Sequence, residues 1–242
     1  MIQMTKKLLL AAAITTSLNA ATELSTNEIK QIENLELFKR AQINITKAYD
    51  MGNLYALKIK VQGNNDEVFL TKDKKSLITG EVIDTASGAK VTIPADLTGV
   101  RGKEAFTYGS GSDEYFLFTD PECPYCKKFE SYFLQIEKNV KIRVFYYPLE
   151  FHKNAKDMSI YIMSKKTTED KSKTMLSLDL NDEAYKNRKY SKEELAKLEA
   201  KLAEQMSIAQ NLGVQGTPAV FDKKGNKVSW PNMLQKYGVN LQ

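Results

Sequence analysis

Residues 115–147 read YFLFTDPECPYCKKFESYFLQIEKNVKIRVFYY and predict a strand, a helix and a second strand, in that order. Tyr115 to Thr119 and Lys141 to Tyr147 are short runs rich in aromatic and β-branched side chains, which are typical of buried strands. Cys123 to Lys138 lies between them, and Pro124 suits the first turn of a helix because the N–H that proline lacks has no partner there. The stretch therefore predicts a βαβ unit whose helix begins at the motif Cys-Pro-Tyr-Cys.

The two cysteines of this motif are the only ones in the chain, and their placement predicts thiol chemistry. The unpaired N–H groups and the dipole at a helix N-terminus stabilise an anion, so we expect Cys123 to be the thiolate and the nucleophile. Cys126, one turn later, is placed to attack a mixed disulfide on Cys123 and release the substrate. Lys127 and Lys128 favour the thiolate and Glu122 opposes it, and we expect the helix terminus to dominate.

A Cys-x-x-Cys motif is also half of many zinc sites. A tetrahedral site needs about two further ligands, and the chain contains a single histidine, His152. We therefore expect no metal site. A Cys–His hydrolase would not require the second cysteine, so we expect His152 to be a surface or loop residue.

The C-terminal part contains a second motif, Gly216-Thr217-Pro218-Ala219. Residues 155–212 are mainly helical in pattern, with a capping box at residues 191–194, and a closing hairpin and a short helix follow the second motif. Thr-Pro before a strand is by itself a turn signal, but the bond is also a candidate for a cis peptide. In combination with the dithiol, it predicts that Pro218 lies against the sulfurs and that the Thr217 backbone is free to pair with an extended substrate chain.

The N-terminal part has a different pattern. Residues 25–40 predict one amphipathic helix, and five strand-like runs between residues 43 and 93 predict a small antiparallel sheet. A core of this size often gains stability by pairing with a copy of itself, so we expect a homodimer. Gly109-Ser110-Gly111-Ser112 reads as a hinge. The predicted domains are residues 21–93 for dimerisation, 94–112 as a linker and 113–242 for catalysis.

Residues 1–20 have the layout of a secretory signal peptide. Lys6 and Lys7 precede the apolar run Leu8 to Ile14, and small residues follow, so we expect cleavage after Ala20 or Ala21. The bulky Leu18 leaves open a short, uncleaved anchor. Export predicts the periplasm of a Gram-negative bacterium. Because a bridge between two cysteines three positions apart constrains an unfolded chain little, the pair indicates chemistry more than structural support.

Composition excludes several classes of protein. With 242 residues, 42% of them hydrophobic and 27% charged, the chain is neither disordered nor collagen-like. The net charge of +5 is spread along the sequence, which gives no support for binding nucleic acid. After the first run no uncharged segment approaches the length of a membrane span, so we expect no stable membrane insertion.

Residues 118–129 resemble the active-site segment of the periplasmic DsbC/DsbG family of thiol:disulfide interchange proteins, and Pro124-Tyr125 is similar to DsbG in particular. The motif around Pro218 resembles that family's cis-proline loop. Residues 68–73 and 80–88 look like part of its N-terminal dimerisation domain.

This resemblance implies an α+β protein that forms a V-shaped homodimer. Each chain would have a cystatin-like base of a helix on an antiparallel sheet, a linker helix and a C-terminal thioredoxin fold with a helical insertion, and an apolar cleft between the arms would take misfolded proteins. Cys123 and Cys126 would be catalytic, and Pro124, Tyr125, Thr217 and Pro218 would form the active-site loop and bind the substrate backbone. No cofactor is implied, and a membrane reductase of the DsbD type would keep the dithiol reduced.

The leading prediction is a reductase or isomerase of non-native disulfides in exported proteins. A DsbG-like reductase of sulfenylated single cysteines and a redox-independent chaperone remain as alternatives. A DsbA-like oxidase is disfavoured by the N-terminal domain and by Thr217. A cytosolic glutaredoxin, which also uses Cys-Pro-Tyr-Cys, is disfavoured by the signal segment and the extra domain.

Overall fold

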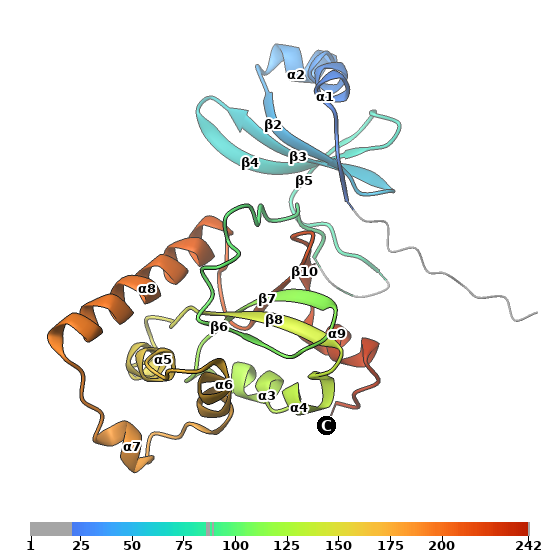
Figure 1. The fold of residues 1–242 in the computed structure, drawn as a ribbon. Coiled ribbons are helices and arrows are strands. Elements are labelled where there is room, and N and C mark those ends of the chain that lie inside the picture. Colours follow the sequence, from blue (N-terminus) through green and yellow to red (C-terminus); the bar gives the residue numbers. More distant parts are fainter. Residues whose placement is uncertain (1–20, 86–87, 89, 242) are drawn as a thin grey trace, which may run out of the picture. The chain divides into compact units, whose positions relative to one another are not determined.

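The structure is a computed structural model that describes residues 21–85, 88 and 90–241. It divides into two compact units, Met1–Glu81 and Val82–Gln242 (Figure 1). The predicted signal peptide, residues 1–20, lies outside the described residues. None of the helices in the described part of the chain is long and apolar enough to span a bilayer.

The first unit is a five-stranded antiparallel sheet with two helices on one face (Figure 1). The spatial order of its strands is the chain order: β1 (Thr22–Glu23), β2 (Asn44–Asp50), β3 (Leu54–Val61), β4 (Asn64–Thr71) and β5 (Leu77–Thr79). The predicted strand over residues 90–93 is reduced to an isolated bridge between Ile83 and Lys90. The predicted combination of helix and antiparallel sheet is confirmed.

The single helix predicted for residues 25–40 is two helices, α1 (Thr26–Glu33) and α2 (Glu36–Arg40). Ser25 caps α1 through a complete capping box with Glu28. Leu35 has an extended backbone, φ −63° and ψ 144°, and interrupts the helical path. Both helices still bury one large apolar side chain, Ile32 and Phe38, against the sheet.

The second unit contains the predicted βαβ arrangement. β7 (Asp113–Thr119) and β8 (Val140–Tyr146) pair in parallel and are joined through α3 (Pro124–Glu130) and α4 (Phe133–Ile136). The full sheet has the order β10-β9-β7-β8-β6, and its other pairs are antiparallel. The remaining strands and the last helix are β6 (Phe106–Tyr108), β9 (Ala219–Asp222), β10 (Lys227–Val228) and α9 (Trp230–Lys236). This mixed α+β architecture is the predicted fold class.

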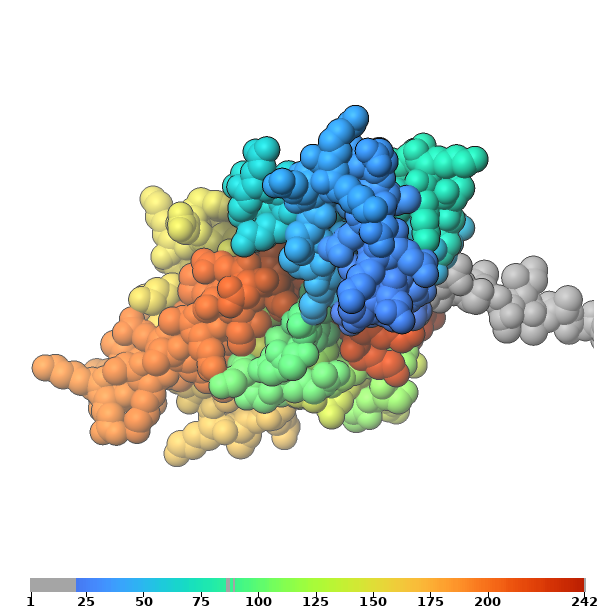
Figure 2. Space-filling view, turned by 90° about the horizontal axis from the view of Figure 1, so that it is seen from above, coloured from blue at the N-terminus to red at the C-terminus, as the bar shows by residue number. Residues whose placement is uncertain are grey.

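A helical insertion lies between β8 and β9. It consists of α5 (Ala155–Met163), α6 (Thr168–Ser177), α7 (Glu183–Lys186) and α8 (Lys192–Asn211). Ser191 caps α8 by accepting the N–H of Glu194 at 3.1 Å, which is one half of the predicted capping box. The helix buries Leu202, Gln205 and Ala209, and its opposite side is on the molecular surface, orange in Figure 2.

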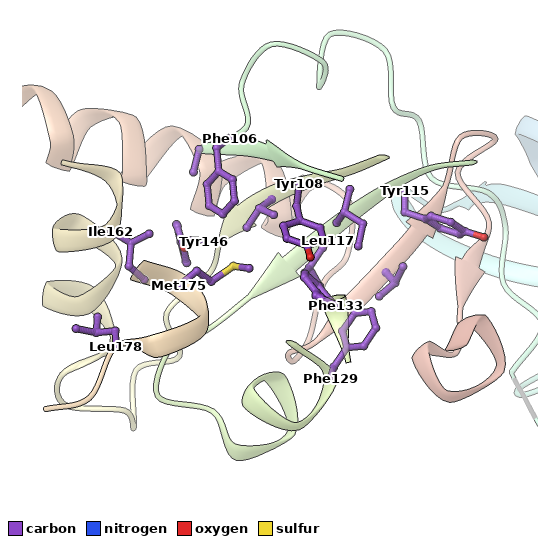
Figure 3. Packing of buried hydrophobic residues seen from close by; sticks show 14 of the residues in the cluster. Phe106, Tyr108, Tyr115, Leu117, Phe129, Phe133, Tyr146, Ile162, Met175 and Leu178 are labelled. Atoms are coloured by element: carbon purple, nitrogen blue, oxygen red, sulfur yellow. The ribbon is translucent and has the colours of Figure 1, made fainter. Parts of the chain in front are cut away.

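One apolar core joins the sheet to these helices. Figure 3 shows Phe129 and Phe133 on one side of the sheet, with Tyr108 and Leu117 above them. The rings of Phe129 and Phe133 meet edge to face with centroids 5.0 Å apart. The same core takes side chains from α5 and α6, so the insertion is packed onto the sheet.

The segment predicted as a linker, residues 94–112, belongs to the second unit instead. Ala95 N–H donates to the Gly225 carbonyl at 2.8 Å, Leu97 and Val100 are buried beside Phe116, and β6 pairs with β8. The described residues of this segment form no helix, so the implied linker helix is wrong. The physical reason is that the outer edge of β8 and the apolar face around Phe116 bind the segment.

The predicted hinge at residues 109–112 is a close-packed turn. Ser110 N–H donates to the Glu137 carbonyl at 2.9 Å, and Gly111 N–H donates to the Val140 carbonyl at 2.9 Å. A Cβ atom at Gly111 would lie 1.9 Å from the carbonyl carbon of Asn139. Glycine is therefore needed here for the close approach of two backbones rather than for flexibility.

Candidate active site

The dithiol lies where β7 passes into α3. Cys123 is the N-cap of α3, with an extended backbone at φ −73° and ψ 122°, and its carbonyl accepts the Lys127 N–H at 3.0 Å. Pro124 occupies the first turn, as the sequence predicts. The side chain at the N-cap position is next to the unpaired N–H groups of the helix, which is the environment that stabilises a thiolate.

The second predicted motif meets the first. The Thr217–Pro218 peptide bond is cis, and the Cys123 thiol donates to the Thr217 carbonyl at 3.5 Å. β9, which begins directly after Pro218, pairs with β7, which ends just before the dithiol. The structure therefore brings Cys123, Thr217 and Pro218 together, although they are far apart in the sequence.

The two thiols and the tyrosine between them differ in exposure. Cys123 is 5% exposed and Cys126 is fully buried, whereas the Tyr125 side chain is 68% exposed. Burial raises the pKa of the Cys126 thiol well above its ordinary value. The nearby Thr119 and Thr217 side chains and the Asp120 backbone act to lower this pKa, but their effect is smaller. Cys126 is thus a protonated, interior thiol.

Glu130 is a site residue that the sequence reasoning missed. It lies one helical turn after Cys126, is 2% exposed, and its Oε1 accepts the Thr119 hydroxyl at 2.7 Å. Burial raises the pKa of its carboxyl to about 7, although Lys127 and Thr119 act to lower it. The only available signal was an acid four residues after Cys126, on a helical face otherwise occupied by Phe129 and Phe133.

The half-buried Lys127 side chain contacts both α6 and Glu130. Its Nζ donates to the Met175 carbonyl of α6 at 2.8 Å and lies 3.8 Å from Oε2 of Glu130. That oxygen is buried and has no hydrogen-bond partner among the described residues. The structure therefore pairs Lys127 with Glu130, and its predicted effect on the Cys123 thiolate stays a prediction.

Asp120 is a buried anchor for the loop that follows β8. Its Oδ1 accepts the Glu122 N–H at 2.8 Å, and its Oδ2 accepts the Leu149 N–H at 2.7 Å. The same Oδ2 lies 2.8 Å from Nδ1 of His152. His152 is a loop residue, as predicted, but a partly buried one that is paired with the segment leading into the dithiol.

Glu122, like Asp120, is hydrogen-bonded to the loop that follows β8. Its two carboxylate oxygens accept the backbone N–H and the side-chain amide of Asn154 at 2.7 and 3.0 Å. The sequence predicted that this acid opposes the Cys123 thiolate. In the structure its carboxylate accepts two donors from the neighbouring loop, and the expectation that the helix terminus outweighs it stays a prediction.

Metal-ligating side chains are not grouped in the part of the chain that the structure describes. Among those residues, no three His, Cys, Asp or Glu side chains are arranged to hold an ion. The arrangement around Cys123 is instead suited to nucleophilic chemistry, with a thiol at a helix N-terminus, a second thiol one turn later and a buried carboxyl beyond it.

Several solved structures resemble this chain. The catalytic domain of Proteus mirabilis ScsC is 19% identical with a TM-score of 0.41, and the match covers 57% of this chain and 90% of that one. The thiol-disulfide exchange protein alpha-DsbA2 from Wolbachia pipientis is 16% identical with a TM-score of 0.43, over 57% of this chain and 88% of that one. Helicobacter pylori DsbG is 12% identical with a TM-score of 0.38, over 82% of this chain and 100% of that one.

None of the curated proteins matches the sequence. A family described as thioredoxin-like domain matches residues 109–234, which is more than half of the chain. The matched range contains Cys123, Cys126 and Pro218 and most of the second unit. This chain therefore belongs to the thioredoxin-like domain family.

Proposed function

We propose that this chain is an exported thiol:disulfide oxidoreductase that reduces or isomerises non-native disulfides in other exported proteins. The observation that carries the proposal is the placement of Cys123 at the N-terminus of α3, 3.5 Å from the carbonyl of Thr217, next to cis-Pro218. A nucleophilic thiol beside an extended backbone segment is suited to a substrate that is itself an extended polypeptide.

The reaction begins with attack by the Cys123 thiolate on one sulfur of a substrate disulfide. A bond forms between that sulfur and Cys123, and the other substrate sulfur leaves as a thiolate and takes up a proton. In isomerisation this substrate thiol, once deprotonated again, attacks another disulfide of the substrate. The thiolate freed by that exchange then attacks the substrate sulfur bound to Cys123, and Cys123 leaves as a thiolate. In reduction Cys126 attacks Cys123, the substrate leaves with two thiols, and the two electrons come from the Cys123–Cys126 pair.

Cys126 must lose its proton before it can attack, and its interior position makes this difficult. Glu130, with a pKa of about 7, accepts the proton near neutral pH. Thr119, whose hydroxyl is bonded to Glu130, also lowers the pKa of Cys126 and so connects the two groups. In this proposal Cys123 is the nucleophile, Cys126 the resolving thiol and Glu130 the proton acceptor.

The resemblance to the DsbC/DsbG family supports the wider setting of the proposal. The chain would be exported to the periplasm of a Gram-negative bacterium, work as a homodimer through its first unit, and be reduced by a membrane protein of the DsbD type. Tyr125 and Pro124 would influence the reduction potential of the dithiol, and Thr217 and Pro218 would bind the substrate backbone. No metal or organic cofactor would take part.

A second candidate is favoured by the Pro124-Tyr125 dipeptide, which is similar to DsbG. In this case Cys123 attacks the sulfur of a sulfenylated single cysteine, the oxygen leaves as water, and Cys126 then releases the reduced partner. The first bond-forming step is the same, and only the leaving group differs.

Recovery of activity by a scrambled multi-disulfide protein in a mildly reducing thiol buffer distinguishes the two candidates. We expect this chain to accelerate recovery at least about tenfold, because a catalyst thiol attacks faster than buffer thiols. The Cys126→Ser variant keeps the first step and lacks the second, so it should accumulate a covalent adduct with the substrate on a non-reducing gel. No acceleration, with Cys123 still reactive toward a sulfenylated protein, would favour the second candidate.

A further inference from the structure

Two large aromatic side chains are exposed on the segments that surround the dithiol. Tyr125 lies between the cysteines and is 68% exposed, and Phe151 lies in the loop after β8 and is 74% exposed. The rings of Phe151 and His152 pack at an interplanar angle of 68°, with centroids 4.5 Å apart. Phe151 belongs to none of the apolar cores of the described residues, so the fold does not require its side chain.

The loop that carries Phe151 is fastened to the segment that carries the nucleophile. Asp120 binds the Leu149 N–H and His152, and Glu122 binds Asn154 through both of its oxygens. The carbonyl of Asp120 also accepts the Cys123 N–H at 3.1 Å. One buried residue therefore holds both the nucleophile and the loop on which Phe151 is displayed.

Burying the Asp120 carboxylate and exposing the Phe151 ring are both unfavourable for folding. A carboxylate as buried as Asp120 is stable only when it is fully hydrogen-bonded, and such buried polar networks hold a segment in a single conformation. The loop that Asp120 holds exposes the Phe151 ring to solvent, and contact of apolar surface with water is unfavourable. An aromatic side chain held in one conformation buries a large apolar area on binding at a small cost in conformational entropy.

We propose that Phe151 determines substrate specificity by contacting an apolar side chain of the polypeptide that Cys123 attacks. This inference rests on the proposed function and deepens it. An extended chain advances about 3.3 Å per residue, so side chains within about three residues of the attacked cysteine lie over the segments next to Cys123. The exposed Glu150 and Lys153 on either side of Phe151 carry opposite charges, so the anchor itself selects apolar rather than charged side chains.

The test compares three disulfide probes that differ in size and in the side chain they offer to Phe151. The first is a small aromatic disulfide, 5,5′-dithiobis(2-nitrobenzoate). The other two are disulfide-linked peptides that are identical except for leucine or serine two residues from the cysteine. The second-order rate constant for attack by Cys123 is measured with the full chain and with its Phe151→Ala variant.

We expect Phe151→Ala to lower the rate constant for the leucine peptide about tenfold, the scale of one lost apolar contact in a binding site. The rate constants for the serine peptide and the small disulfide should not change. Leu134→Ala is the matched control, because Leu134 is 73% exposed on α4 and has no part in the loop, and it should leave all three rate constants unchanged. Phe151→Leu should restore most of the lost rate.

Two results would overturn the inference. An equal decrease with all three probes would show that Phe151 supports the site as a whole, and no decrease with the leucine peptide would show that it does not touch the substrate. Failure of the proposed function looks different, because the unaltered protein would then react with neither peptide disulfide faster than a simple thiol does.

Discussion

Replacing Cys123 by serine is expected to abolish thiol–disulfide exchange while the fold is retained. A serine hydroxyl is not ionised near neutral pH, even at a helix N-terminus, and Cys126 is buried with a raised pKa and does not substitute for the lost nucleophile. The rate of disulfide reduction should fall by more than about a thousandfold. Because serine is a preferred N-cap residue, α3 should not be weakened.

The measurement is reduction of a protein disulfide by the pre-reduced chain, with the thermal midpoint recorded beside it. Cys126→Ser is the control, since it keeps Cys123 and so retains formation of the mixed disulfide. Full activity in Cys123→Ser would mean that the nucleophile is wrongly assigned. If Cys123→Ser still prevents aggregation of an unfolded protein as well as the unaltered chain does, that activity is a chaperone function separate from the dithiol.

Replacing Glu130 by glutamine should stabilise the folded protein at alkaline pH. The pKa of this carboxyl is about 7 in the folded protein and 4.5 ordinarily, so between these pH values the folded state holds a proton that the unfolded state has lost. Stability therefore decreases as the pH rises through this window, and the decrease remains above pH 7. At pH 8 we expect a gain of about 1–3 kcal/mol in Glu130→Gln, since the amide has no charge to bury.

Urea unfolding at pH 4.5 and pH 8 checks this expectation. Glu130→Gln should differ little from the unaltered chain at the lower pH and be more stable at the higher one. Glu169→Gln is the control, because its side chain is 75% exposed on α6 and exposed charges contribute little to stability. If the free energy of unfolding changed with pH in the same way in Glu130→Gln as in the unaltered chain, the burial of this carboxylate would not destabilise the fold.

The same variant separates two roles of Glu130 in catalysis. The negative charge of Glu130 raises the pKa of Cys126, so a role that acts through charge alone predicts faster attack by Cys126 once the charge is removed. A proton acceptor predicts the opposite, a decrease of at least about tenfold near pH 7. The decay of the mixed disulfide, followed against pH on non-reducing gels, decides between these outcomes.

The parts of the fold that follow from local pattern could be predicted from the sequence. β7, α3 and β8 have strand and helix signals of their own, and the dithiol was placed correctly at the start of α3 because Pro124 marks the first turn. β6 and the segment before it could not be found in this way. Their residues show no periodicity, and the strand owes its existence to the unpaired edge of β8.

The site likewise contains residues that a short motif predicts and residues that only tertiary packing brings together. Cys123, Cys126 and Pro218 belong to short motifs and were recognised. Glu130 and the pair of Asp120 with His152 depend on which side chains become buried, and burial is decided by tertiary packing. A lone acid in a helix and a lone histidine in a loop are ordinary surface residues in most sequences, so only the three-dimensional structure reveals their roles.

The pairing of β6 with β8 also decides where the thioredoxin-like unit can be cut from the rest of the chain and still keep a complete sheet. A piece excised at residue 109, where the thioredoxin-like match begins, would lack β6 and leave the outer edge of β8 with unsatisfied N–H and C=O groups. Such an open edge is a template for self-association. The excised piece would also lose Leu97 and Val100, both buried against the sheet. The smallest portion of this chain with a closed core therefore begins near Ala95, well ahead of the matched range.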